Sequence, residues 1–198
     1  MVDSMAFPSA PNASKAIEGP ILELVALLLL GSSAKSVLPD CQVRSGAQAT
    51  LSALRQAEHS WGLVHFASHA HYNRKQPTES VIELSDGNLR LKQLDQLALA
   101  DHSLVALSCC QGGESKGQAL DEPVTLATGF SAAGAETVIG NLWRVDDEVA
   151  RVFFVAFYRE LAQGSSPPGS FRQAQAQTRR AYPHTRDWGG FFLLGNPS

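Results

Sequence analysis

The sequence has 198 residues, which favours one domain, and its 44% hydrophobic and 18% charged content is ordinary for a globular protein. The net charge of -3 provides no basic surface for nucleic acid or for a membrane. The apolar run at residues 21–30 is too short to span a bilayer, and Asp3 replaces the cationic start of a secretory signal. Three cysteines make no disulfide framework. We therefore expect a cytoplasmic protein that binds neither nucleic acid nor a membrane.

Short apolar runs alternate with segments of helical period, which is typical of βαβ units and a mostly parallel sheet. Strands are predicted at residues 2–7, 41–44, 62–67, 104–109, 137–142 and 191–194. The third, fourth and fifth are nearly continuous apolar runs, as expected for strands covered by helices on both faces. A hairpin is predicted within VIELSDGNLRL, with Asp86 and Gly87 in its turn.

Helix-end signals are clear in the second half of the chain. Asp121 is expected to cap a helix that Gly134 stops. The acidic residues 146–148 favour the positive dipole end of the next helix. Ser170 and Gln173 are predicted to form the capping box of the last one.

Two strand ends carry reactive side chains. The predicted strand at residues 62–67 leads to His69, and the strand at 104–109 leads to Cys110. In an open parallel sheet, ligands and catalytic groups gather beyond the carboxyl ends of the strands. A thiol becomes a competent nucleophile when a neighbouring imidazole takes its proton. The alternative is structural, because a cysteine at the end of a buried strand is usually a small core residue.

Other residues near these ends have simpler interpretations. His65 lies within its strand and is expected to be buried and hydrogen-bonded, and Cys109 is expected to pack. His65, His69 and His71 share strand parity, which suggests a metal site. However, Asn73 and Arg74 stand where a metallo-β-lactamase element has Asp and His, and a zinc site needs three or four converging ligands. We therefore expect no metal and no organic cofactor.

Four blocks of the sequence resemble a known family. They are VHFASHAHY, SLVALSCCQGG, GFSAAGAETVIGNLWRVDDEVARVFFVAFYREL and RDWGGFFLLGNPS, and together they look like a CHAT domain, over residues 49–197 and in the family's order. CHAT domains belong to the peptidase clan of caspases, gingipains and separase. The resemblance implies a three-layer α/β caspase-like fold, with a mostly parallel central sheet of about six strands and helices on both faces. It implies a single domain over residues 1–198, of which residues 1–48 are the weakly matched N-terminal part.

The resemblance also implies the site. The family's histidine lies in an H-F-x-[ST]-H element and falls on His69, and its cysteine, in an L-S-A-C element, falls on Cys110, with Cys109 where alanine is usual. The backbone N–H groups of Ala70 and Cys110 would hold the oxyanion. The family usually has glycine at the position of Ala70. If the backbone there needs a positive φ, alanine is strained; if it does not, the methyl group is tolerated.

Substrate recognition is implied by GNLWRVDD, which resembles the corresponding stretch of separase. Asp147 matches the aspartate that recognises a basic side chain in that relative, so we expect Arg or Lys before the scissile bond, with Trp143 as a wall of the cleft. The alternative is that Asp146 and Asp147 only cap and charge a helix. Trp143 would then be part of the core.

The function implied is that of a cysteine endopeptidase with a Cys110/His69 dyad that cleaves a protein or peptide substrate. Such domains are often regulated by helical repeats or by a partner protein, and the loop at residues 111–120 is the expected place for gating. The competing interpretation is a catalytically silent caspase-like module for protein interaction or signalling, since fold alone does not imply activity.

Overall fold

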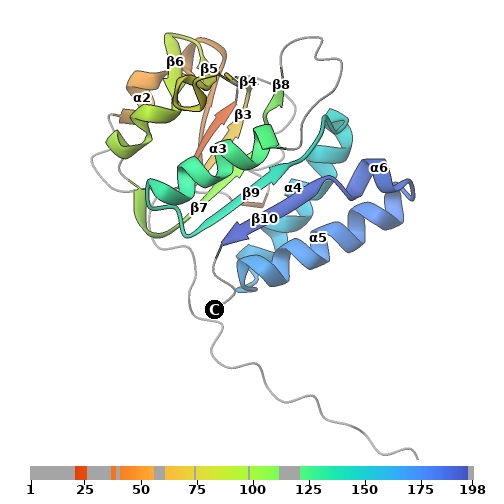
Figure 1. Ribbon diagram of the computed structural model, residues 1–198. Coiled ribbons are helices and arrows are strands. Elements are labelled where there is room, and N and C mark those ends of the chain that lie inside the picture. Colours follow the sequence, from red (N-terminus) through yellow and green to blue (C-terminus); the bar gives the residue numbers. More distant parts are fainter. Residues whose placement is uncertain are drawn as a thin grey trace, which may run out of the picture.

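The computed structural model describes residues 21–25, 37–38, 41–55, 61–73, 75–97, 99–111 and 121–195. Its larger sheet has six strands: β1 (Ile21–Val25), β2 (Gln42–Ser45), β3 (Trp61–Ala67), β7 (Leu99–Leu107), β9 (Thr137–Asn141) and β10 (Phe191–Gly195). They follow the order β10-β9-β7-β3-β1-β2 (Figure 1). All neighbours are parallel except β10 and β9, so the predicted mostly parallel sheet of about six strands is confirmed.

Five of the predicted strands are present. Four of them differ from the prediction by at most one residue at each end, whereas β7 begins at Leu99 rather than at residue 104 and ends at Leu107 rather than at residue 109. The predicted strand at residues 2–7 lies outside the described residues. Strand β1 was not predicted, although it lies between β3 and β2 in the sheet. It was missed because the apolar run at residues 21–30 has no alternation and no turn signal at the end of β1, so periodicity alone cannot separate a strand from a helix.

Helices cover both faces of this sheet. One face carries α2 (Leu51–Arg55), α3 (Asp121–Ala132) and the 3-10 helix η3 (Leu91–Gln96); the other carries α4 (Asp147–Ala162) and α5 (Pro167–Ala181). Strand β3 shows why its run is apolar apart from His65. Val64 and Phe66 pack on the α3 side, whereas Leu63 and Ala67 pack on the α4 side. Successive side chains of a strand point to opposite faces, and both faces are buried here.

A smaller sheet of four strands lies at the carboxyl ends of the central strands. It contains β4 (His69–His71), β5 (Val81–Leu84), β6 (Gly87–Arg90) and β8 (Cys110–Gln111), in the order β6-β5-β4-β8 (Figure 1). Strand β4 follows β3 after one residue, and β8 follows β7 after two. The small sheet therefore extends the two central strands of the large one.

The predicted hairpin is confirmed as β5 and β6, but its turn is one residue earlier than expected. Leu84 pairs with Gly87, so Ser85 and Asp86 form the turn. The Asp86 carboxylate accepts hydrogen bonds from the backbone N–H of Leu51 at 2.6 Å and of Ser52 at 3.2 Å. These bonds, led by that from Leu51, lower the pKa of Asp86. Asp86 thus caps α2 and ties the hairpin to this helix, which packs on the large sheet.

The start of α5 differs from its prediction. The helix begins at Pro167 after Ser166, whose Oγ accepts a hydrogen bond from the N–H of Gly169. The predicted capping box of Ser170 and Gln173 is wrong, because Ser170 is buried inside the helix. Proline fixes φ at a helical value and needs no partner for its nitrogen, so the helix starts there instead.

The remaining elements are short: η1 (Gly46–Gln48), η2 (Pro77–Glu79) and α6 (Thr185–Trp188). Helix α3 ends at Ala132, and Gly134 follows with a φ of 112°, so the predicted glycine stop is confirmed. Among the described ranges, no helix is long and apolar enough to cross a lipid bilayer.

Candidate active site

His69 and Cys110 are paired in the small sheet. They are Cα partners in the parallel ladder between β4 and β8, and Ala70 and Gln111 form the next pair. Neighbouring strands lie about 4.8 Å apart. The side chain of His69 is exposed, as is that of His71. The carboxyl edge of the central strands therefore brings an accessible imidazole beside the backbone of a cysteine.

Ala70 shows how β4 is fixed. It is only 4% exposed and packs with Ile82 and Leu89 in the core on the α3 side, while the residues before and after it face outward. It pairs with Ile82 of β5 and with Gln111 of β8, so its backbone is extended. Any residue adopts that conformation, and alanine is therefore unstrained where the family usually has glycine.

Hydrogen bonds fix the points where the central strands pass into the small sheet. Ser68 is buried, and its Oγ donates to the carbonyl oxygen of Glu83 at 2.5 Å. The N–H of Ser108 donates to the carbonyl oxygen of Phe66 at 2.9 Å, and the Sγ of Cys109 lies 3.5 Å from the same oxygen. Cys109 also packs against the core on the α3 side, which agrees with the packing role predicted for it.

His65 is a buried structural residue, as predicted. Its side chain is 1% exposed, its Nδ1 lies 2.7 Å from the hydroxyl oxygen of Tyr158, and its ring centroid lies 4.5 Å from that of Phe154. Burial lowers the pKa of His65 from 6.5 to about 3, so the ring is neutral near pH 7. His65 is enclosed under α4, whereas His69 and His71 are exposed. Within the described part of the chain, no group of three or more potential ligands could hold a metal ion.

Trp143 and Asp147 follow β9, at the same edge of the sheet. The Nε1 of Trp143 donates to the carbonyl oxygen of Arg186 at 2.7 Å, and its indole packs so closely on Gly190 that a Cβ there would lie 2.7 Å from Cε2. Asp146 caps α4 by accepting from the N–H of Glu148 at 2.9 Å. Asp147 is exposed in the first turn of that helix. The capping role predicted as an alternative thus belongs to Asp146.

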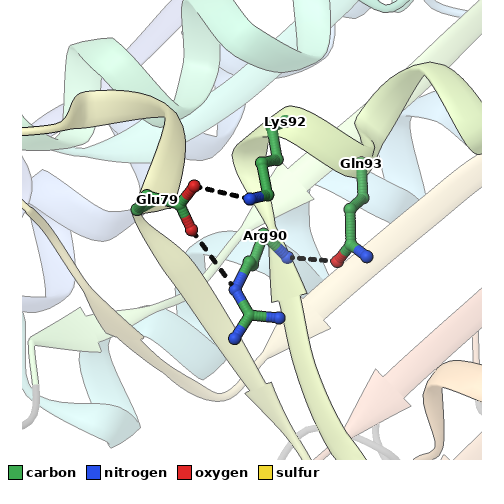
Figure 2. Close-up of polar contacts among 4 residues, drawn as sticks. All are labelled: Glu79, Arg90, Lys92 and Gln93. Carbon is green, nitrogen blue, oxygen red and sulfur yellow. Dashed lines mark hydrogen bonds and ion pairs between the residues drawn. The ribbon is translucent and has the colours of Figure 1, made fainter.

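An imidazole and a carboxylate form a pair on the small sheet that the sequence does not predict. The Nε2 of His71 lies 2.6 Å from the Oε1 of Glu83. Figure 2 shows a second group next to the β5–β6 hairpin: the carboxylate of Glu79, the last residue of η2, lies 2.6 Å from the Nζ of Lys92 in η3 and 3.4 Å from the Nε of Arg90 at the end of β6. The alternation of the hairpin could have placed Glu83 on the outer face, but the sequence does not give its register against β4.

The fold and the edge at which His69 and Cys110 meet define a caspase-like α/β domain. The CHAT domain family model matches residues 7–196, and the chain belongs to that family. Among solved structures, it is similar to the Arg-specific cysteine proteinase gingipain R, with a TM-score of 0.60 and 11% identity, over 94% of this chain and 48% of that one. At such identity, the similarity shows the fold alone.

Two curated proteins are similar over a shorter region. Tetratricopeptide repeat protein 28 of Homo sapiens is 35% identical over 95 residues, and its Mus musculus counterpart is 36% identical over 95 residues. Each match covers 47% of this chain and 4% of the relative. The matched half of this chain therefore corresponds to a small part of each of these proteins.

Proposed function

We propose that the chain is a cysteine endopeptidase in which Cys110 is the nucleophile and His69 the general base and acid. The observation that carries this proposal is the pairing of the two residues in adjacent parallel strands, with the imidazole exposed. Membership of the CHAT family and the fold shared with a cysteine proteinase support it. Burial of His65 removes that histidine as a candidate base, whereas His69 is exposed beside Cys110.

The reaction uses one proton carrier in both halves. His69 takes the proton of the Cys110 thiol as sulfur attacks the peptide carbonyl carbon, and then gives that proton to the leaving amine when the C–N bond breaks. Water next attacks the thioester while His69 accepts its proton. As the C–S bond breaks, His69 returns that proton to the sulfur, which restores the thiol, and the product leaves as a carboxylic acid that ionises in water. The backbone N–H groups of Ala70 and Cys110 are the proposed oxyanion donors.

The proposed preference is for Arg or Lys immediately before the scissile bond. Asp147 supports it, because its carboxylate is exposed and Asp146 already caps α4. Trp143 is the proposed wall of this pocket, since its indole is fixed against Gly190 at the end of β9. A carboxylate beside a rigid aromatic surface suits the charge and the apolar stem of a basic side chain.

The proposed regulator is a helical-repeat region or a partner protein. The names of the two curated relatives support this, because both are tetratricopeptide repeat proteins of which the matched region is a small part. The loop at residues 111–120, which is predicted to gate the site, lies outside the described residues after Gln111. A thiol nucleophile also fits the reducing cytoplasm.

The second candidate is a silent module that binds a protein without cleaving it. The relatives favour this candidate, because they are named as repeat proteins and repeat proteins commonly act through binding surfaces. The two candidates differ in one respect: only the peptidase needs the thiol.

A digest of a diverse peptide library, read by mass spectrometry, tests the proposal. We expect the chain to generate new termini that Cys110→Ala and His69→Ala do not generate. Cys109→Ala is the matched control, because it removes the neighbouring thiol and should still cleave. Equal digestion by Cys110→Ala would contradict the assignment. A chain that cleaves nothing, and binds its partner equally well with Cys110→Ala, would favour the module.

A further inference from the structure

Glu83 lies in the same row of the small sheet as the proposed dyad. Strands β4 and β5 are antiparallel, with Ala70 opposite Ile82. Continuing this register by one residue puts Glu83 opposite His69, whose other neighbour is Cys110. Ala70 and Ile82 both point into the core, so the adjacent residues of their strands project to the outer face.

The carboxylate of Glu83 is available to a ligand. Its partner on this face is His71, at 2.6 Å, and the two side chains are 45% and 44% exposed. An ion pair this exposed contributes at most about 1 kcal/mol. A substrate cation can therefore replace the imidazole at little cost.

Two permanent cations on or next to the hairpin contact a different carboxylate. Arg90, on the next strand of the hairpin, and Lys92 both contact the carboxylate of Glu79 (Figure 2). Among the described residues, Glu83 thus has a titratable partner rather than an arginine or a lysine. Its negative charge is not permanently neutralised.

The strand order places Glu83 on the leaving-group side of the scissile bond. Asp147 follows β9, beyond the strand that leads to Cys110, whereas Glu83 lies on β5, beyond His69. In the proposed mechanism His69 delivers a proton to the departing amine, so the amine leaves on the histidine side. Glu83 is two strand spacings, about 10 Å, from the position of Cys110, which is within the reach of about three extended residues.

We propose that Glu83, with His71 as its resting partner, forms a subsite for a Lys or Arg side chain among the first three residues after the scissile bond. This inference rests on the proposed peptidase function and adds a second basic position to its substrates. Asp147 and Glu83 would then bind basic side chains on opposite sides of the scissile bond.

Matched peptides test the subsite. They share Arg before the scissile bond and carry either Lys or Gln at each of the three positions after it. We expect the chain to cleave the best Lys peptide with a kcat/KM about fivefold above that of its Gln counterpart, the ratio for one exposed ion pair. In Glu83→Gln this ratio should fall to about one, because cleavage of the Lys peptide slows.

Two variants serve as controls. Glu79→Gln removes a carboxylate from the same surface, but one committed to Arg90 and Lys92, and should keep the preference. His71→Gln removes the resting partner of Glu83 and should keep or raise the preference for the Lys peptide. An unchanged ratio in Glu83→Gln would overturn the subsite. Equal slowing of all peptides in that variant would also overturn it, since this would indicate that Glu83 acts through His69.

The same measurements separate this inference from the proposed function. A peptide warhead that ends at the reactive carbonyl occupies only the side before the scissile bond, so its reaction with Cys110 tests the dyad without engaging the Glu83 subsite. If kcat/KM is the same for the Lys and Gln peptides at all three positions after the scissile bond, the subsite proposal fails and the peptidase proposal stands. If Cys110 neither reacts nor cleaves any peptide, the peptidase proposal fails and the subsite fails with it.

Discussion

His69 and Cys110 are register partners in the parallel strands β4 and β8. The relationship is set by backbone pairing rather than by loop conformation, because both strands are short extensions of the central strands β3 and β7. Buried Ala70 and the Ser68 hydrogen bond to Glu83 fix the β4 side. The fold thus holds the backbones of the two residues about one strand spacing apart.

Asp147 is expected to determine the residue before the scissile bond. Asp147→Asn should lower kcat/KM for peptides with Arg there by about tenfold, the effect of losing one charged hydrogen bond, and leave peptides with Gln unchanged. Asp146→Ala is the control: it removes the cap of α4 and should cost about 1 kcal/mol of unfolding free energy while keeping the preference. If the unmodified chain cleaves equally well after Arg and after Glu, Asp147 does not determine the residue before the scissile bond.

Ala70 is expected to be the better residue at its position, although the family usually has glycine. Its backbone is extended and its methyl group is buried, so Ala70→Gly should lower the unfolding free energy by about 1 kcal/mol and should not raise the cleavage rate. Urea denaturation and peptide cleavage measure the two effects. A several-fold gain in the cleavage rate would contradict this, because it would show that the oxyanion site needs a backbone conformation, such as a positive φ, that glycine adopts and alanine does not.

His65 is expected to make the domain sensitive to acid. Its folded pKa, about 3, lies below its ordinary value of 6.5, so the unfolded chain binds the proton first as the pH falls. Its contribution to stability is full above pH 6.5 and decreases toward pH 3, by up to about 1.4 kcal/mol per pH unit.

Urea denaturation between pH 7 and 5 measures this slope. His65→Leu should flatten it, whereas the exposed His71→Gln should not. Tyr158→Phe keeps the titrating ring and should keep the slope, even though it removes the hydroxyl bonded to Nδ1. A slope that survives in His65→Leu would assign the acid sensitivity to other groups.

The sequence predicts the layers of this fold well, because strands covered on both faces give continuous apolar runs and helix ends carry local signals such as Gly134. It does not predict β1, whose run lacks alternation, or the start of α5, where Pro167 competes with the capping box at Ser170. Glu83 was missed for a different reason. Its proposed role depends on the pairing of β5 with β4, which no local pattern specifies. The catalytic roles of His69 and Cys110 remain predictions.

The most direct test of the central claim is the rate at which a peptide warhead ending in Arg labels Cys110, measured by mass spectrometry of the intact chain and of its peptides. We expect one label per chain, located on Cys110. It should be absent in Cys110→Ala, at least tenfold slower in His69→Ala, and unchanged in Cys109→Ala and His71→Gln. Labelling of Cys110 at the same rate with and without the imidazole of His69 would contradict the dyad.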